Sequence, residues 1–152
     1  MMLKQLFLII LSIIFFQLNA FSQQLKETEV PKIVRDSVKK KYPEVYVYEW
    51  EWKKKRNVYQ AEFIIKGSEY EADFTKEGIW VKTERDVSRN DIPVLVWERF
   101  NTSEYVSWKI EDLEEHNTPK YTFVYAFELS SRKGKVLLYF LPTGELLETF
   151  VQ

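Results

Sequence analysis

The sequence predicts an α+β protein in which two short helices pack on one face of an extended antiparallel sheet. Two observations lead to this fold class. A Val-Pro or Ile-Pro pair that suits a helix start occurs twice, with its proline at Pro31 and again 62 positions later at Pro93. Each pair precedes aromatic strands and a turn that ends in glycine, Gly78 in one copy and Gly144 in the other. A tandem repeat of one helix plus four antiparallel strands accounts for both observations.

The first 22 residues have the pattern of a secretory signal peptide. Lys4 precedes an apolar run over residues 6–16, and the small residues Ala20 and Ser22 suit cleavage after Ser22. The apolar run is shorter than the roughly 20 residues that a membrane-spanning helix needs. We therefore expect a periplasmic or secreted protein with no membrane span after cleavage.

The rest of the chain is predicted to form one domain of two repeats. Residues 23–29 are polar and lack periodicity, so we expect a flexible leader there. The domain would then occupy residues 30–152, with the repeats at residues 30–88 and 89–152.

Hydrophobic spacing places the elements of the first copy. Ile33, Val34 and Val38 recur at helical intervals, and Tyr42-Pro43 would end a helix that begins at Pro31. Beyond it, apolar and polar residues alternate with the period of two of half-buried strands. The strands expected from this alternation cover residues 45–52, 58–66, 69–74 and 79–85.

The second copy is predicted in the same way. Asn90-Asp91 suits the cap of a helix whose first turn contains Pro93. The small insertion that distinguishes the copies is placed at residues 114–119, interpreted as a polar hairpin loop. Both helices should cover one face of the sheet and leave the other face to solvent. The strands expected here cover residues 105–113, 121–129, 135–141 and 145–151.

Composition excludes several classes of function. The 152 residues include 22 basic and 23 acidic side chains, a formal net charge of −1, which favours neither nucleic acid nor an anionic membrane surface as a partner. Cysteine is absent, so disulfides and thiolate metal sites are excluded. Stability must therefore come from packing, for which 5 Trp, 9 Tyr and 11 Phe are available.

No catalytic constellation is recognisable. His116 is the one histidine, and its place in the polar stretch 114–119 predicts a solvated loop residue. The serines have no partner in a known nucleophile pattern, and the four glycines are isolated in turns rather than grouped for phosphate binding. We therefore expect no enzyme activity, no cofactor and no metal site.

The outward sheet face is the first candidate binding surface. If the first three strands pair in sequence order, six carboxylates form an acidic field on that face. A mixed acidic and aromatic face would suit a protein partner, although an ordinary hydrated sheet face accounts for the same pattern. The six residues are Glu49, Glu51, Glu62, Glu69, Glu71 and Asp73.

The excess of aromatic residues is the second candidate. Most rings should belong to the core, and alternation places four of them on the inner face of the first strand: Tyr46, Tyr48, Trp50 and Trp52. Two short helices cover only part of the sheet, so some rings near strand ends are expected to remain exposed as binding anchors. The three proposed anchors are Trp52, Trp80 and Tyr121.

A set of short motifs runs through both copies: Val30-Pro31, Ile92-Pro93, Tyr42-Pro43 before Trp50-Glu51, Tyr59-x-Ala-x-Phe63, Phe74-x-x-x-Gly78 and Tyr139 to Leu147. These motifs resemble the PepSY-like, β-lactamase-inhibitor-like (BLIP-like) domains of exported bacterial proteins. The resemblance covers about residues 30 to 150 and implies helix-plus-sheet modules that act outside the cytoplasm without catalysis. Inhibitors of this shape grip an enzyme with the sheet, and no individual residue's role is carried over.

The expected function is therefore a non-enzymatic periplasmic module, protein-binding or inhibitor-like, that uses the exposed sheet face to bind an envelope protein or peptide. The alternative is a small-ligand or cation-binding sensor of the cell envelope. The sequence does not identify the partner. Edge strands at both ends of the sheet leave the oligomeric state open.

Overall fold

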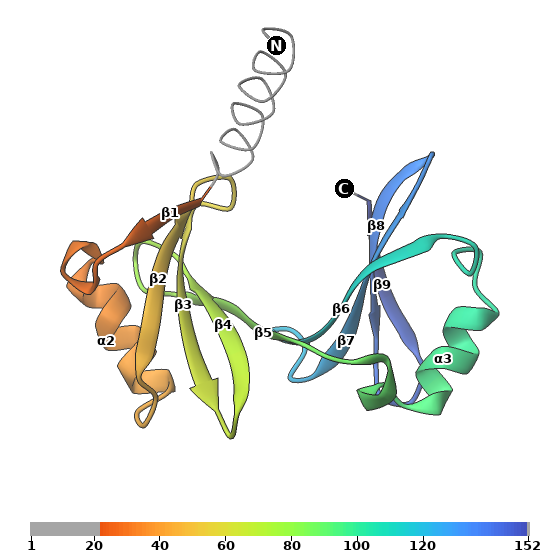
Figure 1. Ribbon diagram of the computed structural model, residues 1–152, viewed down its shortest axis with the longest axis horizontal. Coiled ribbons are helices and arrows are strands. Elements are labelled where there is room, and N and C mark those ends of the chain that lie inside the picture. The colour runs from red at the N-terminus through yellow and green to blue at the C-terminus, as the bar shows by residue number, and fades with distance from the viewer. Residues whose placement is uncertain (1–21, 152) are drawn as a thin grey trace, which may run out of the picture.

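The computed structural model describes residues 22–151, which form one nine-stranded antiparallel sheet with two α-helices (Figure 1). The strands are hydrogen-bonded in sequence order from β1 to β9. Residues buried beneath the helices share one face of this sheet, so the predicted α+β fold with both helices on one face is confirmed. The predicted signal peptide lies, apart from Ser22, outside the described residues.

Each half of the described chain contains a 3-10 helix, an α-helix and four strands, and the first half has β1 as an additional strand at its start. The first half contains β1 (Ser22–Leu25), η1 (Glu27–Glu29), α2 (Lys32–Lys41), β2 (Val47–Lys53), β3 (Val58–Ile65), β4 (Ser68–Phe74) and β5 (Trp80–Asp86). The second contains η2 (Arg89–Asp91), α3 (Val94–Asn101), β6 (Lys109–Asn117), β7 (Val124–Ser131), β8 (Gly134–Phe140) and β9 (Leu146–Val151).

The expected flexible leader is structured instead. Residues 22–25 pair with β2, with Gln23 opposite Trp52, and residues 27–29 form a 3-10 turn. The reason is that β2 would otherwise present unpaired backbone groups along an edge of the sheet. Three of the four β1 residues stay exposed, so no alternation marked this strand in the sequence.

Each α-helix buries its apolar stripe on its own half of the sheet. In Figure 1, α2 lies at the left end of the molecule and α3 at the right end, and the strands of the sheet run from one end to the other. The hydrophobic core beneath the helices is correspondingly divided into two clusters. The first includes Val34, Val38, Trp50, Phe63 and Phe74, and the second includes Val96, Phe100, Phe127, Leu129 and Phe140.

The repeated glycine turn passes close to the backbone of the helix in each half. The φ angles of Gly78 (+77°) and Gly144 (+86°) lie in the left-handed region that favours glycine. A Cβ atom on Gly78 would lie 2.9 Å from the carbonyl oxygen of Ile33, and one on Gly144 would lie 2.5 Å from that of Leu95. Ile33 and Leu95 are in the first turns of α2 and α3. The glycines therefore allow the turns to touch the helix backbones.

The strand β6 begins and ends four residues later than predicted. Residues 105–108 precede it, and the rings of Tyr105 and Trp108 contact each other with centroids 5.2 Å apart. Residues 114–117, interpreted as part of a loop, instead pair with β5 and join the two halves of the sheet. That interpretation was wrong because polar residues on β6 lie opposite polar residues on β5, so the strand lacks apolar alternation.

Candidate functional site

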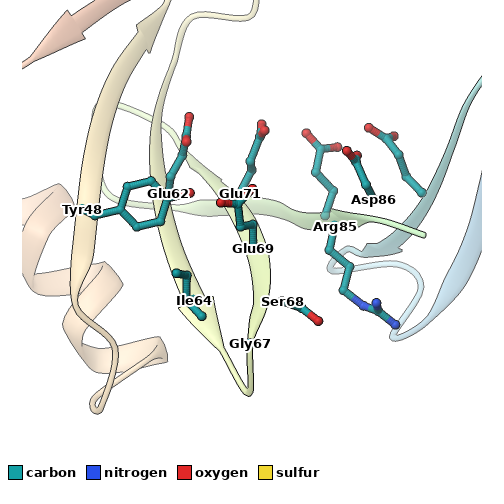
Figure 2. A pocket seen from close by; sticks show the side chains of 11 residues that line it. Tyr48, Glu62, Ile64, Gly67, Ser68, Glu69, Glu71, Arg85 and Asp86 are labelled. Carbon is teal, nitrogen blue, oxygen red and sulfur yellow. The ribbon is translucent and has the colours of Figure 1, made fainter. Parts of the chain in front are cut away.

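The sheet face that is turned away from the helices, called the open face below, contains an acidic pocket of about 430 Å³ (Figure 2). Strands β2 to β6 supply its lining. Five residues other than acids contribute: Tyr48, Ile64, Gly67, Ser68 and Arg85. Six carboxylate side chains complete it: Glu62, Glu69, Glu71, Glu84, Asp86 and Glu114.

Strand register brings these carboxylates together. Glu62 lies opposite Glu71, and Glu71 lies opposite Glu84 on the next strand. At the β5–β6 junction, Asp86 lies opposite Glu114. Like charges directly opposite each other destabilise a sheet. The pocket therefore costs folding free energy that packing elsewhere must offset.

The carboxyl pKa values reflect this crowding. Burial raises the pKa of Glu71 to about 7, with a further contribution from the charges of Glu84 and Glu62. The pKa values of Glu62 and Asp86 are raised as well, first by burial and then by neighbouring carboxylates. A cation placed among these groups would relieve both the repulsion and the desolvation of the charged forms.

Two members of the predicted acidic field are neutralised within the protein. Asp73 is buried, accepts a hydrogen bond from Gln60 Nε2 at 3.0 Å and pairs with Arg56 Nη1 at 2.8 Å. Glu51 contacts the ammonium of Lys53. Both carboxylates lie on the open face, but neither lines the acidic pocket. Their negative charges are balanced by ion pairs within the protein and do not contribute to the acidic pocket.

Of the four remaining predicted acids, three line the acidic pocket and one lies beside it. Glu62, Glu69 and Glu71 line the acidic pocket. Glu49 lies opposite Glu62 in the β2–β3 register and outside the lining. The structure thus brings together half of the predicted field and adds three acids from β5 and β6 that the sequence did not suggest.

A β-bulge in β2 changes which aromatic rings face the open side. The register shifts between Val47 and Glu49, and a bulge of this kind re-aims the residues around it. Tyr48, predicted to lie on the inner face, lines the acidic pocket instead. Tyr46 is 82% exposed, whereas Trp50 is 5% exposed in the first core cluster. The inner-face prediction therefore fails at Tyr46 and Tyr48.

The three proposed aromatic anchors do not form one surface. Trp80 lies on the helix side, where Lys41 Nζ is 3.4 Å from the centroid of its ring. Trp52 lies on the same side, opposite Tyr59, which packs against the first core cluster, and the centroids of these two rings are 4.7 Å apart. Tyr121 lies on the open face of the second half, with its ring edge-on to Tyr139 at 6.2 Å between centroids. All three rings are partly buried.

An aromatic cluster occupies the open face beyond the β5–β6 junction. Tyr139 contacts Tyr121 and also Phe150, which is 41% exposed and whose ring centroid is 5.2 Å away. Val124 and Ala126 are completely buried beneath neighbouring side chains. The open face therefore has an acidic part in the first half and an apolar, aromatic part in the second.

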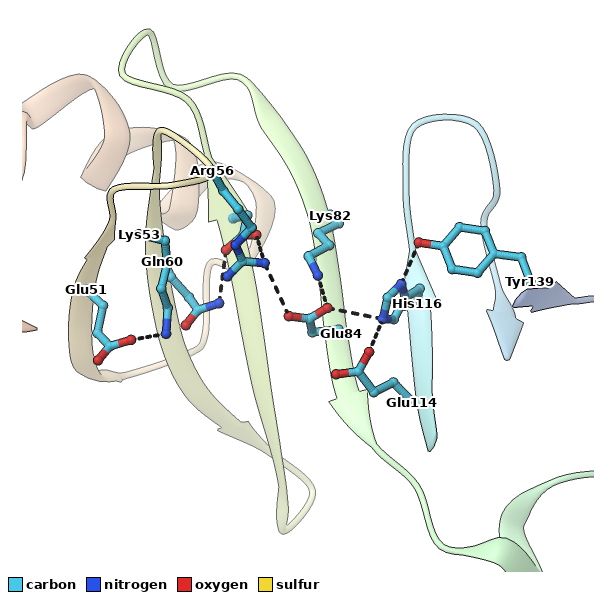
Figure 3. Close-up of polar contacts among 10 residues, drawn as sticks. Glu51, Lys53, Arg56, Gln60, Lys82, Glu84, Glu114, His116 and Tyr139 are labelled. Atoms are coloured by element: carbon cyan, nitrogen blue, oxygen red, sulfur yellow. Dashed lines mark hydrogen bonds and ion pairs between the residues drawn. The ribbon is translucent and has the colours of Figure 1, made fainter. Parts of the chain in front are cut away.

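His116 lies between these two parts and was missed by sequence reasoning. It is 2% exposed in β6, where Nε2 lies 2.6 Å from Glu114 Oε2 and 3.1 Å from Glu84 Oε2 (Figure 3). The other ring nitrogen, Nδ1, lies 2.8 Å from the Tyr139 hydroxyl. Burial lowers the pKa of His116, but hydrogen bonds with Glu114 and Glu84 outweigh it and leave the pKa raised.

Glu84 links His116 to the first half of the sheet. Its burial would raise its pKa, but contacts with His116 and Lys82 outweigh this effect and hold the pKa at about 2. Arg56 Nη1 lies 3.8 Å from Glu84 Oε1 and also pairs with Asp73. Figure 3 shows this continuous polar network on the open face. Its only sequence signal is the polarity of residues 114–117.

Comparison with known proteins places the chain in a family. A family model described as "Putative beta-lactamase-inhibitor-like, PepSY-like" matches residues 18–64 and again residues 57–148. The chain belongs to this family. The resemblance inferred from the sequence motifs is thereby confirmed.

Several solved structures from Bacteroides species are similar to this PepSY-like protein. A BLIP-like protein of Bacteroides fragilis is 28% identical, with a TM-score of 0.63 and coverage of 80% of this chain and 85% of that one. A DUF2874 family protein of Bacteroides ovatus is 26% identical, with a TM-score of 0.62 and coverage of 80% and 86%. One of Bacteroides eggerthii, 23% identical with coverage of 80% and 88% and a TM-score of 0.61, is described as "putative periplasmic".

These similar structures identify the fold, but their descriptions name no binding target. No curated protein matches the sequence significantly. Within residues 22–151, none of the helices has the length and apolar character required to cross a membrane. What this PepSY-like chain can do must therefore be inferred from its own surface, where the acidic pocket and the aromatic cluster share one face.

Proposed function

We propose that this protein is a non-enzymatic module of the cell envelope, periplasmic or secreted, that binds a protein or peptide partner on its open face. A basic side chain of the partner would enter the acidic pocket. The observation that carries the proposal is the pocket itself, in which six carboxylates converge on a face that no helix covers. The signal-peptide pattern and the family support a location outside the cytoplasm.

The charge balance of the pocket favours a cationic side chain as the occupant. Of the residues that line it, only Arg85 is basic, and its guanidinium is paired with Glu115 at 2.5 Å. A lysine or arginine of a partner would supply the missing positive charge. Its apolar stem could rest on Tyr48 and Ile64, which are 42% and 54% exposed.

The aromatic cluster supplies the second half of a protein-binding surface. Rings give large contact areas at low cost in conformational entropy, and they often anchor protein interfaces. Phe150 and Tyr139 lie on the same face as the acidic pocket, on the other side of the β5–β6 junction. A partner that spans the junction would meet charge on one side and aromatic surface on the other.

Charge reversal at the pocket tests the proposal. The variant Glu62→Lys/Glu69→Lys should bind lysine- or arginine-containing peptides at least about tenfold more weakly in fluorescence anisotropy, because it replaces attraction by repulsion. The control Glu44→Lys/Glu98→Lys makes the same change in net charge at exposed positions outside the pocket. Equal binding by the two variants would show that the pocket is the wrong surface.

The alternative function, a sensor for a small cation, predicts a different result in the same assay. The acidic pocket would then bind free arginine or a polyamine as tightly as it binds a basic peptide. Substitution of Phe150 by Ala would separate the two cases. It should weaken binding of a peptide that reaches the aromatic cluster and leave binding of a small cation unchanged.

A further inference from the structure

Three ligand atoms of a kind that metal ions prefer converge at the β5–β6 junction. Nε2 of His116 and one carboxylate oxygen each of Glu84 and Glu114 all lie within 4.8 Å of one another. Two other groups on the described chain have this spacing, and both consist of carboxylates alone. The junction is distinguished by a buried imidazole nitrogen, which an exposed acidic cluster does not provide.

Nε2 of His116 faces more acceptor oxygens than it has protons to donate. Nε2 carries at most one proton, yet two carboxylate oxygens lie within 3.1 Å of it. One N–H group can point directly at only one of these oxygens, or be shared between the two. A divalent cation in place of that proton would bind the nitrogen and both oxygens together. Binding would release one proton from the imidazolium form of His116.

The surroundings hold the imidazole as metal sites usually do. A histidine ligand normally has its second ring nitrogen held by a hydrogen-bonding partner that fixes the ring. Here the Tyr139 hydroxyl lies 2.8 Å from Nδ1, and the rings of the two residues meet edge-on (Figure 3). The ring is therefore positioned with Nε2 towards the two carboxylates.

A metal ion could also reach these atoms. Glu84 and Glu114 both line the acidic pocket, which opens to solvent, and the Glu114 side chain is 22% exposed. The ammonium of Lys82 contacts Glu84. Lys82 lies directly opposite Asp73 on β4, so its ammonium can turn towards that carboxylate when a cation binds Glu84.

The geometry points to a zinc-type divalent metal site formed by His116, Glu84 and Glu114, with a fourth coordination position facing the acidic pocket. One imidazole and two carboxylates match the nitrogen and oxygen ligands of zinc sites that keep an open position. Calcium and magnesium prefer oxygen ligands, calcium in greater number, and should bind here weakly. Metal binding would be a property additional to partner binding, because neither the acidic pocket nor the aromatic cluster requires a metal to bind a partner.

Zinc titration of a tag-free protein tests the site. Isothermal titration with ZnCl₂ should give one site per chain, and a tenfold excess of CaCl₂ should not displace the zinc. Glu114→Gln preserves the size of the side chain but removes a charged ligand, so binding should weaken at least about tenfold. The control Asp112→Asn removes a carboxylate from a neighbouring all-acid group and spares the three ligands. It should bind zinc with less than about a twofold change.

Nuclear magnetic resonance supplies an independent measurement. His116 is the one histidine of the chain, so its imidazole signals can be assigned without ambiguity. Stoichiometric zinc should shift these signals in the wild type. Unshifted signals, or equal affinity of Glu114→Gln and Asp112→Asn, would overturn the metal site. Peptide binding is measured in the presence of a chelator, so the proposed function and the metal site can fail separately.

Discussion

Substitution of Gly144 by alanine should destabilise the protein through the contact between the glycine turn and helix α3. Two costs add. A non-glycine residue in the left-handed region costs about 1–2 kcal/mol. The new Cβ would also lie 2.5 Å from the carbonyl oxygen of Leu95 and 2.9 Å from its carbon, and relieving such overlap typically costs about 1–3 kcal/mol. We expect the free energy of unfolding to fall by about 2–5 kcal/mol.

Gly67 provides a matched control for the first of these costs. Its φ is +84°, close to the +86° of Gly144, but a Cβ there would have no neighbouring atom within 4 Å. Gly67→Ala should therefore lower the free energy of unfolding by only about 1–2 kcal/mol. The difference between the two variants isolates the contact with α3.

Urea denaturation followed by tryptophan fluorescence measures both variants. The midpoint should fall further for Gly144→Ala than for Gly67→Ala, with the slope unchanged, since the surface exposed on unfolding stays the same. Equal losses of stability in the two variants would refute the reasoning. The turn would then tolerate a Cβ by moving away from the helix, and the repeated glycine would serve only the backbone conformation.

Two further predictions concern charges on the open face. Glu71→Gln should stabilise the protein at pH 8 by about 1–2 kcal/mol after allowance for partial exposure, because a pKa raised from 4.5 to about 7 makes ionisation unfavourable in the folded state. The gain should be absent below pH 4.5, grow between pH 4.5 and about 7, and level off above that. A gain independent of pH in denaturation curves would contradict this. Arg56→Ala should cost about 2 kcal/mol, because it removes the guanidinium 2.8 Å from the buried carboxylate of Asp73. Lys54→Ala, in the same exposed turn, should change the unfolding free energy by less than about 0.5 kcal/mol, and an equal effect of both changes would exclude the buried pair as the cause.

The site could be predicted from the sequence only in part. Glu62, Glu69 and Glu71 were placed on one face because alternation along a strand assigns sides with no knowledge of the fold. Glu84 and Glu114 were not, since their contribution depends on how β5 of one half pairs with β6 of the other. The pairing of strands from the two halves is set by the tertiary structure, and it leaves no periodic pattern in the sequence of either strand.

His116 is a residue whose burial could not be predicted from the sequence. Polar neighbours predicted a solvated loop, but Glu84 and Glu114 satisfy the imidazole and allow its burial in a strand. Tyr48 is a second case, because the bulge beside it moves the ring from the inner face to the acidic pocket. Both errors arise where hydrogen bonding between strands overrides the pattern along one strand.

The sequence by itself determined the α+β class, the two helices on one sheet face and the family, because these depend on periodicity, turn residues and short motifs. Only the tertiary structure decided what lies on the open face. Strand register placed three predicted acids beside Glu84, Asp86 and Glu114, whereas Glu51 and Asp73 form ion pairs and do not line the pocket. The physical reason is that fold class follows from local preferences, whereas a site depends on which distant side chains come within a few ångströms.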